Sequence, residues 1–164
     1  MVSAVFDTST LILLAKVDLL RAIGQQMKVV IPRVVEHEAT RSAHLFDAQY
    51  IRQMIDEGLI HIVADPEHGA TQHLRHDFRL GKGEVACLAV AIHHRWSMAT
   101  DDGQAIKACK VLGVPFTTAL GLLVQSVEKK LMTRETALAK LDTLKSCGWY
   151  APALLDQIGG ELTQ

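Results

Sequence analysis

The feature that most constrains the fold is a regular alternation of short apolar segments with helical patterns. Five apolar runs have the length of strands, and a segment with helical periodicity or turn residues follows each of them. Parallel strands need long crossover connections, so this alternation is typical of a parallel sheet covered by helices on both faces. The expected strands are residues 2–6, 28–31, 59–63, 96–100 and 114–117.

The segments between these strands are expected to be helical. Residues 83–94 are apolar on all sides, which indicates a helix buried in the interior. Pro32 is expected at the first position of a helix, where its missing N–H costs nothing. Further helices are expected at 11–16, 18–23, 46–57 and 104–112, with loops and helix at 66–80, and helices from about residue 118 that break near Met132 and at Gly148.

Composition limits the organisation and the location of the chain. A length of 164 residues without repeats or linkers predicts one domain over 1–164, with the helices from about residue 133 packing on it. The three cysteines lack CxxC spacing, so neither a disulfide framework nor a zinc site is indicated. Neither a membrane-spanning run nor a signal peptide is recognisable, and we expect a cytoplasmic protein. The net charge of −1 implies that any contact with nucleic acid is local or uses metal ions.

Acidic residues fall where α/β folds build their sites. Asp7 follows the first strand, and Asp101 and Asp102 follow the strand at 96–100. Glu84 lies in the first turn of the apolar helix, and Glu38 lies on the helix after the second strand. Ligands in such folds bind outside the carboxyl ends of the strands.

Each acid also has a purely structural interpretation. Asp7 and Asp102 could cap helices, and Glu84 could favour the positive end of a helix dipole. Helical spacing places Glu38 over the apolar residues before it, whereas Glu36 is expected to face water.

A cluster of these acids favours a shared metal ion. Two carboxylates about 5 Å apart repel by roughly 3 kcal/mol at an effective dielectric constant near 20. Cations or bound protons must therefore offset the charge. Hard carboxylate oxygens suit Mg²⁺ or Mn²⁺, and such ions activate water in phosphodiester hydrolysis.

Four motifs in order resemble the PIN-domain family, and in particular its subgroup related to prokaryotic toxin-type ribonucleases. They are VFDTSTLI at 5–12, VIPRVV at 30–35 with Glu38 three residues on, GKGEV at 81–85 and ATDD at 99–102. LGVP at 112–115 and TALGLL at 118–123 extend the resemblance, which covers the chain to about residue 131.

The resemblance implies a Rossmann-like three-layer fold and a Mg²⁺- or Mn²⁺-dependent endoribonuclease. It implies a catalytic set of Asp7, Glu38, Glu84 and Asp102, with Asp7, Glu84, Asp101 and Asp102 as metal ligands and Thr8 or Ser9 supporting the metal or substrate. It also implies a toxin role, with RNA as substrate and an antitoxin protein as partner. Many relatives have one acid where this chain has Asp101 and Asp102, of which we favour Asp102 as the metal ligand, and a further acid where it has Gln104.

Several alternatives stand beside this interpretation. A haloacid-dehalogenase-like phosphatase would need an acid at Ser9, and a receiver domain a lysine near Thr117. A catalytically idle PIN-like scaffold, acting as a protein-interaction module, keeps the fold without the reaction. Surplus apolar residues at 46–57 and 120–127 predict a homodimer. The aromatic pair Trp149-Tyr150 could stack a base, but we expect it to dock the C-terminal helix.

Overall fold

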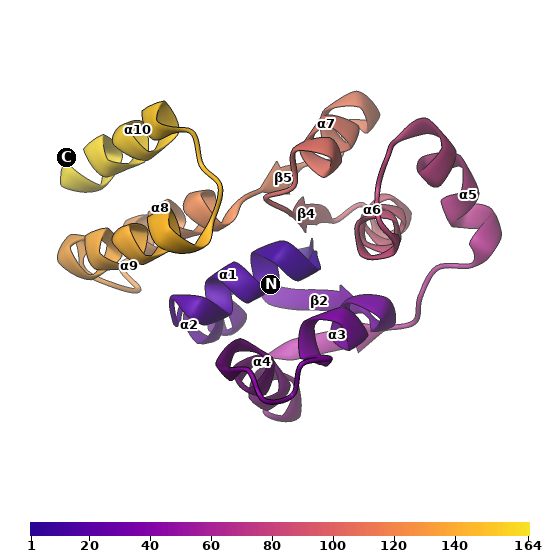
Figure 1. The fold of residues 1–164 in the computed structure, drawn as a ribbon, viewed down its shortest axis with the longest axis horizontal. Helices are drawn as coiled ribbons and strands as arrows, with labels where there is room; N and C mark the ends of the chain where they lie inside the picture. The colour runs from indigo at the N-terminus through magenta and orange to yellow at the C-terminus, as the bar shows by residue number, and fades with distance from the viewer.

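The computed structural model describes residues 1–164 and contains one five-stranded sheet (Figure 1). β1 (Ser3–Phe6) lies in the middle, between β2 (Lys28–Pro32) and β4 (Ser97–Ala99), while β3 (Ile60–Val63) and β5 (Phe116–Thr117) form the edges. Every neighbouring pair of strands is parallel. The predicted α/β fold with a central parallel sheet is therefore confirmed.

Helices connect the strands in two groups. α1 to α4 lie in the connections that lead from β1 to β3, and α5 to α7 lie in those that lead back across the sheet to β5. Crossovers between parallel strands are right-handed, so connections that run in opposite directions cover opposite faces. The bounds are α1 Thr8–Lys16, α2 Leu20–Gln26, α3 Arg33–Thr40, α4 Phe46–Asp56, α5 His68–Asp77, α6 Lys82–His94, α7 Gly103–Leu112, α8 Ala119–Glu128, α9 Arg134–Cys147 and α10 Pro152–Thr163.

The apolar helix predicted from the sequence is α6, and it lies against the centre of the sheet. It contacts β1, β2 and β4, and its residues from Val85 to Ala91 are all buried. Its N-terminus also contacts α3, which brings together two helices that begin at the same edge of the sheet. The all-round apolar pattern of α6 thus reflects neighbours on several sides.

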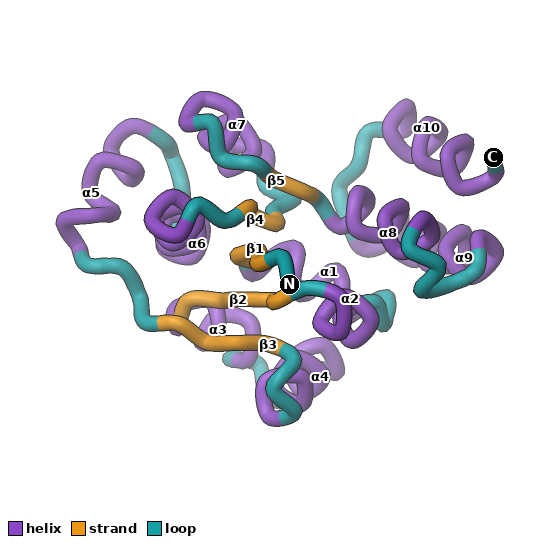
Figure 2. The backbone as a smooth tube through the Cα atoms, turned by 180° about the vertical axis from the view of Figure 1, so that it is seen from behind, coloured by secondary structure: helices purple, strands orange, loops and turns teal.

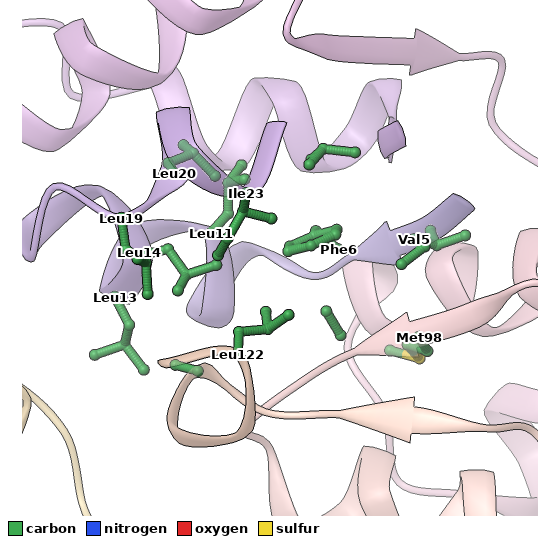
Figure 3. Close-up of a cluster of buried hydrophobic side chains, with 14 of the residues drawn as sticks. Val5, Phe6, Leu11, Leu13, Leu14, Leu19, Leu20, Ile23, Met98 and Leu122 are labelled. Carbon is green, nitrogen blue, oxygen red and sulfur yellow. The ribbon is translucent and has the colours of Figure 1, made fainter. Parts of the chain in front are cut away.

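The main core lies between the sheet and α1, α2 and α8. Phe6 of β1 packs in the cluster formed with Leu11 and Leu14 of α1 and Leu122 of α8 (Figure 3). The same continuous cluster extends to the C-terminal helices through residues such as Leu141 and Leu162. Both views show α8, α9 and α10 gathered at one end of the molecule, far from α5 (Figures 1 and 2).

The leucines of α8, which were one of the two grounds for expecting a homodimer, are buried within the chain. Leu120, Leu122 and Leu123 are buried within the chain, so the apolar surplus of this helix is already covered. On α4, Phe46 remains largely exposed. The homodimer stays a prediction, now supported by α4 alone.

Three local expectations need correction or completion. Pro32 is the last residue of β2 and precedes α3, so the helix begins one residue later than expected. α1 begins at Thr8 rather than at Leu11, because Asp7 caps it. Asp18 lies outside any helix, in a left-handed backbone conformation with φ of 51°.

None of the helices combines the length and apolarity needed to cross a membrane.

Candidate active site at the carboxyl edge of the sheet

The acidic residues singled out above surround the carboxyl ends of the two central strands, β1 and β4. β1 ends at Phe6 and Asp7 follows it, while β4 ends at Ala99 and is followed by Thr100 and the two aspartates. The backbone N–H of Asp7 donates to the carbonyl of Ala99 at 3.0 Å, which ties the two strand ends together. The N-termini of α1, α3, α6 and α7 open onto this edge, which is the usual place for a ligand site in a parallel sheet.

Asp7 is the most buried acid of the site, with 1 % of its surface exposed. Its Oδ1 caps α1 by accepting from the N–H of Thr10 at 2.9 Å and accepts from the Ser9 hydroxyl at 3.1 Å. Its Oδ2 accepts from the Thr100 hydroxyl at 2.5 Å. Burial raises the pKa of the Asp7 carboxyl above its usual value, and these hydrogen bonds oppose that rise.

Glu38 reaches the site from α3 because α6 presents a glycine to it. The Thr8 hydroxyl donates to Glu38 Oε2 at 2.6 Å, so α1 and α3 meet through this pair. A Cβ on Gly83 would lie only 2.6 Å from the same oxygen and 3.3 Å from the carboxyl carbon. The missing side chain of Gly83 therefore leaves the space that the Glu38 carboxylate occupies.

Glu84 stands at the first turn of α6, beside the other acids. Its Oε2 accepts from the N–H of Gly81 at 2.5 Å, as expected for an acid at the positive end of a helix. Burial raises the pKa of the Glu84 carboxyl above its usual value, the Gly81 hydrogen bond opposes the rise, and the charges of Asp102, Asp7 and Glu38 add to it. These three acids are therefore close enough to repel Glu84.

The two adjacent aspartates have different surroundings. Asp102 caps α7, because its Oδ1 accepts from the N–H of Ala105 at 2.8 Å, and its Oδ2 accepts no hydrogen bond from the chain. Asp101 uses both oxygens for structural contacts. It accepts from the Thr10 hydroxyl at 2.6 Å, from the N–H of Ala119 at 3.1 Å, and from the Tyr150 hydroxyl at 3.4 Å.

These contacts give Asp101 and Asp102 different structural surroundings. Asp101 joins α1 to the start of α8 and to the loop before α10, and burial raises the pKa of its carboxyl while its hydrogen bonds oppose that rise. The carboxylate of Asp102 contacts only the start of its own helix and keeps one oxygen free of hydrogen bonds within the chain.

No lysine or arginine balances the acidic cluster of Asp7, Glu38, Glu84 and Asp102. The ion pairs of the molecule join Arg21 to Glu57, Arg33 to Glu36, Lys145 to Asp142 and His76 to Asp77, all outside the cluster. Clustered carboxylates without a basic partner require bound cations or protons.

The acidic cluster consists of carboxylate oxygens, which are the donors that suit a hard divalent cation. In this structure, however, its carboxylates accept hydrogen bonds from other groups of the chain. No three His, Cys, Asp or Glu side chains are arranged so that they could hold one metal ion in this conformation. Yet Oε1 of Glu38, Oε1 of Glu84 and Oδ2 of Asp102 accept no hydrogen bond within the chain, and all are oxygen donors of the kind that Mg²⁺ and Mn²⁺ prefer. Ligation would require rotation of the glutamates or bridging water.

Residues that the sequence did not identify complete the site. Thr100 and Thr10 are fully buried and donate to Asp7 and Asp101, and Gly83 makes room for Glu38. Thr100 could have been found by its position between a buried strand and an acid pair. The contact of Thr10 with Asp101 spans 91 residues of sequence, so no local pattern predicts it.

Glu36 is less exposed than the helical spacing predicted. Its side chain retains 20 % exposure and pairs with Arg33 at 3.3 Å rather than facing open water. It nevertheless contacts none of the four clustered acids or their threonine donors. Glu38 therefore lies in the acidic cluster and Glu36 lies outside it, although Glu36 is less exposed than expected.

A cleft of about 350 Å³ adjoins the acidic cluster. Three groups of residues line it: Ser9, Ile12, Leu13 and Lys16 on one face of α1, the acids Glu84, Asp101 and Asp102, and the segment from Cys147 to Tyr150. Tyr150 packs against the core and its hydroxyl donates to Asp101, whereas Trp149 is fully exposed. The expectation that both rings of the aromatic pair are packed is therefore wrong for Trp149.

Comparison with known proteins agrees with this architecture. The sequence matches the family DUF3368, described as a PIN domain, over residues 3–161. The fold is similar to PAE2754 from Pyrobaculum aerophilum (TM-score 0.57, 16 % identity, 77 % of this chain and 90 % of that chain). It is also similar to a PilT N-terminus domain protein, SSO1118, from Sulfolobus solfataricus P2 (TM-score 0.51, 20 % identity, 77 % of this chain and 94 % of that chain). No functionally curated protein matches the sequence.

Proposed function

The chain belongs to the PIN-domain family DUF3368, whose members are generally nucleases, and we propose that it is a metal-dependent endoribonuclease that hydrolyses RNA phosphodiester bonds. The observation that carries the proposal is the cluster of Asp7, Glu38, Glu84 and Asp102, which has no basic partner at the carboxyl edge of the sheet. Such a cluster does little to stabilise the fold, but it is well suited to bind a cation.

The chain's own groups have distinct tasks in this proposal. Asp102, Glu84 and Asp7 would hold Mg²⁺ or Mn²⁺, and Glu38 would orient a water molecule bound beside them. Thr100, Ser9 and the N–H of Thr10 fix the Asp7 carboxylate, and Thr8 fixes Glu38. The metal would supply positive charge for the phosphate and lower the pKa of bound water.

A cleavage assay tests the proposal. Purified protein is incubated with a labelled single-stranded RNA in Mn²⁺, in Mg²⁺ and in excess EDTA, with Asp7→Asn as the inactive control. We expect cleavage that requires metal and is lost in the control. Equal cleavage by Asp7→Asn, or full activity in EDTA, would overturn the proposal.

The scaffold alternative predicts a different result. A catalytically idle PIN-like module would fold and bind a partner, yet it would leave RNA intact in every metal. The cluster without a basic partner favours the enzyme, because a binding scaffold has no need for repelling carboxylates.

Two partners are proposed from the sequence. We propose an antitoxin protein, as in the toxin-type subgroup, and a second copy of the chain that covers Phe46 on α4. A neighbouring small open reading frame whose product copurifies with the chain would support the antitoxin. Light scattering at tens of micromolar checks the dimer, and a monomeric mass would exclude it.

A further inference from the structure

The cleft beside the acidic cluster carries a feature that metal binding does not explain. Trp149 is a large aromatic residue that lines this cleft, and its side chain is fully exposed. Such a residue is normally buried to a large extent. An exposed tryptophan in a cleft beside a candidate active site therefore points to a ligand with an aromatic face.

The neighbours of Trp149 hold its backbone in place while leaving its ring free. The Tyr150 hydroxyl donates to Asp101 at 3.4 Å, and the Tyr150 ring lies over Gly148. A Cβ at Gly148 would clash with this ring, so the glycine permits the close packing. The segment is thus held in place through Tyr150, directly after Trp149.

The residues of α1 that line the cleft add a positive charge. Ser9, Ile12, Leu13 and Lys16 follow the spacing of one helical face, and Lys16 forms no ion pair. Ser9 and Lys16 are seven residues apart, which corresponds to roughly 10 Å along the helix axis. The cleft is therefore lined by two acids of the cluster, by a lysine about two helical turns from Ser9, and by an exposed aromatic ring.

We propose that Trp149 is a base-stacking residue of this cleft, with an unpaired base of the RNA stacked on its ring and the adjoining phosphate near Lys16. The inference rests on the proposed function, because it places the scissile phosphate at the acidic cluster. Aromatic residues that stack bases are the usual means of holding single strands, since every base offers a π face. In a duplex the bases are already stacked on their neighbours, so the base that Trp149 contacts is an unpaired one.

Binding by three variants separates stacking from apolar contact. All variants carry Asp7→Asn as well, so that the RNA is not cleaved during the measurement. In this background, Trp149→Leu should weaken binding of a short unstructured RNA by roughly 5- to 100-fold, as loss of one stacked base does. Trp149→Phe should retain most of the affinity because it keeps an aromatic face. Phe116→Leu is the matched control, since it removes a partly exposed aromatic ring from β5, which does not line the cleft.

The RNA itself supplies the second comparison. The same oligonucleotide with abasic positions, or annealed to its complement, should bind the parent protein as weakly as the intact strand binds Trp149→Leu. Lys16→Gln should reduce the salt dependence of binding, whereas Lys107→Gln on α7 should not.

The outcomes also separate this inference from the proposed function. Equal affinity for Trp149→Leu and the parent, or a Trp149→Phe variant no better than Trp149→Leu, would overturn the stacking role. A change of oligomeric mass in Trp149→Leu with unchanged RNA affinity would assign the tryptophan to a protein interface instead. If wild-type protein fails to cleave RNA in Mn²⁺ while binding still depends on Trp149, the nuclease proposal fails and the binding inference stands.

Discussion

At the scale of single residues, Gly83 controls how closely α6 approaches Glu38. A side chain there would enter the space of the Glu38 carboxylate, with a Cβ to Oε2 distance of 2.6 Å. The atom in conflict is the end of a flexible side chain, so the fold can respond by moving Glu38 alone. Gly83 therefore affects the site more than it affects the fold.

Replacement of Gly83 by alanine should reduce activity without reducing stability. Alanine favours a helix by roughly 0.5–1 kcal/mol over glycine, so the melting temperature should stay equal or rise. Displacement of Glu38 should reduce metal-dependent cleavage by roughly 10- to 100-fold, as loss of supporting contacts around a metal site does.

The control for this variant is Gly160→Ala in α10, where an added Cβ meets nothing within 4 Å. It should bring the same gain in stability and leave cleavage unchanged. Full activity in Gly83→Ala would show that the position of Glu38 does not matter.

At the scale of elements, Asp101 joins parts of the chain that are distant in sequence. Its carboxylate links α1 through Thr10, α8 through the N–H of Ala119, and the loop before α10 through Tyr150. These contacts give Asp101, which lies beside the acidic cluster, a structural role. They also hold the segment that carries Trp149.

Thr10→Val tests this network, because it removes the hydroxyl and keeps the shape of the side chain. Thr10 is fully buried, and its hydroxyl donates to Asp101 at 2.6 Å. Loss of the donor should lower the free energy of unfolding by about 1–3 kcal/mol. Thr143→Val, at an exposed position of α9, should change it by no more than about 0.5 kcal/mol. Equal effects in urea unfolding would refute the role of Asp101.

The same elements show what sequence can and cannot predict. The strands and the acids at their ends follow from apolar runs and local order, so the sheet was predictable. The structural contacts of Asp101 were not, because they depend on Ala119 and Tyr150, which lie 18 and 49 residues away. The exposure of Trp149 was missed for the same reason, since an aromatic pair before Pro152 gives no sign of which ring is covered.

At the scale of the whole molecule, the acidic cluster should make stability depend on pH when no metal is bound. Burial raises the pKa of Asp7 and Glu84 in the folded state. Below the unfolded values of about 4, both states carry the proton and no penalty arises. As pH rises, the unfolded chain releases its protons first, and folding loses stability until the pH passes the raised values.

Thermal melting of the metal-free protein should therefore show stability that falls as the pH rises above about 4, with a shallower slope in Asp7→Asn. Added Mn²⁺ should raise the melting temperature near neutral pH, because the ion binds only the folded cluster. A slope that is identical in Asp7→Asn and the wild type would contradict the burial cost assigned to this carboxylate.

The central claim is that the acidic cluster binds a divalent cation, and direct titration of metal-free protein with Mn²⁺ tests it. Bound ion can be followed by the loss of the electron paramagnetic resonance signal of free Mn²⁺. Wild type and Glu36→Gln should bind equally well, whereas Glu38→Gln and Asp7→Asn should bind at least roughly tenfold more weakly. Absence of binding by the wild type at millimolar Mn²⁺, or equal binding by all four proteins, would contradict the account.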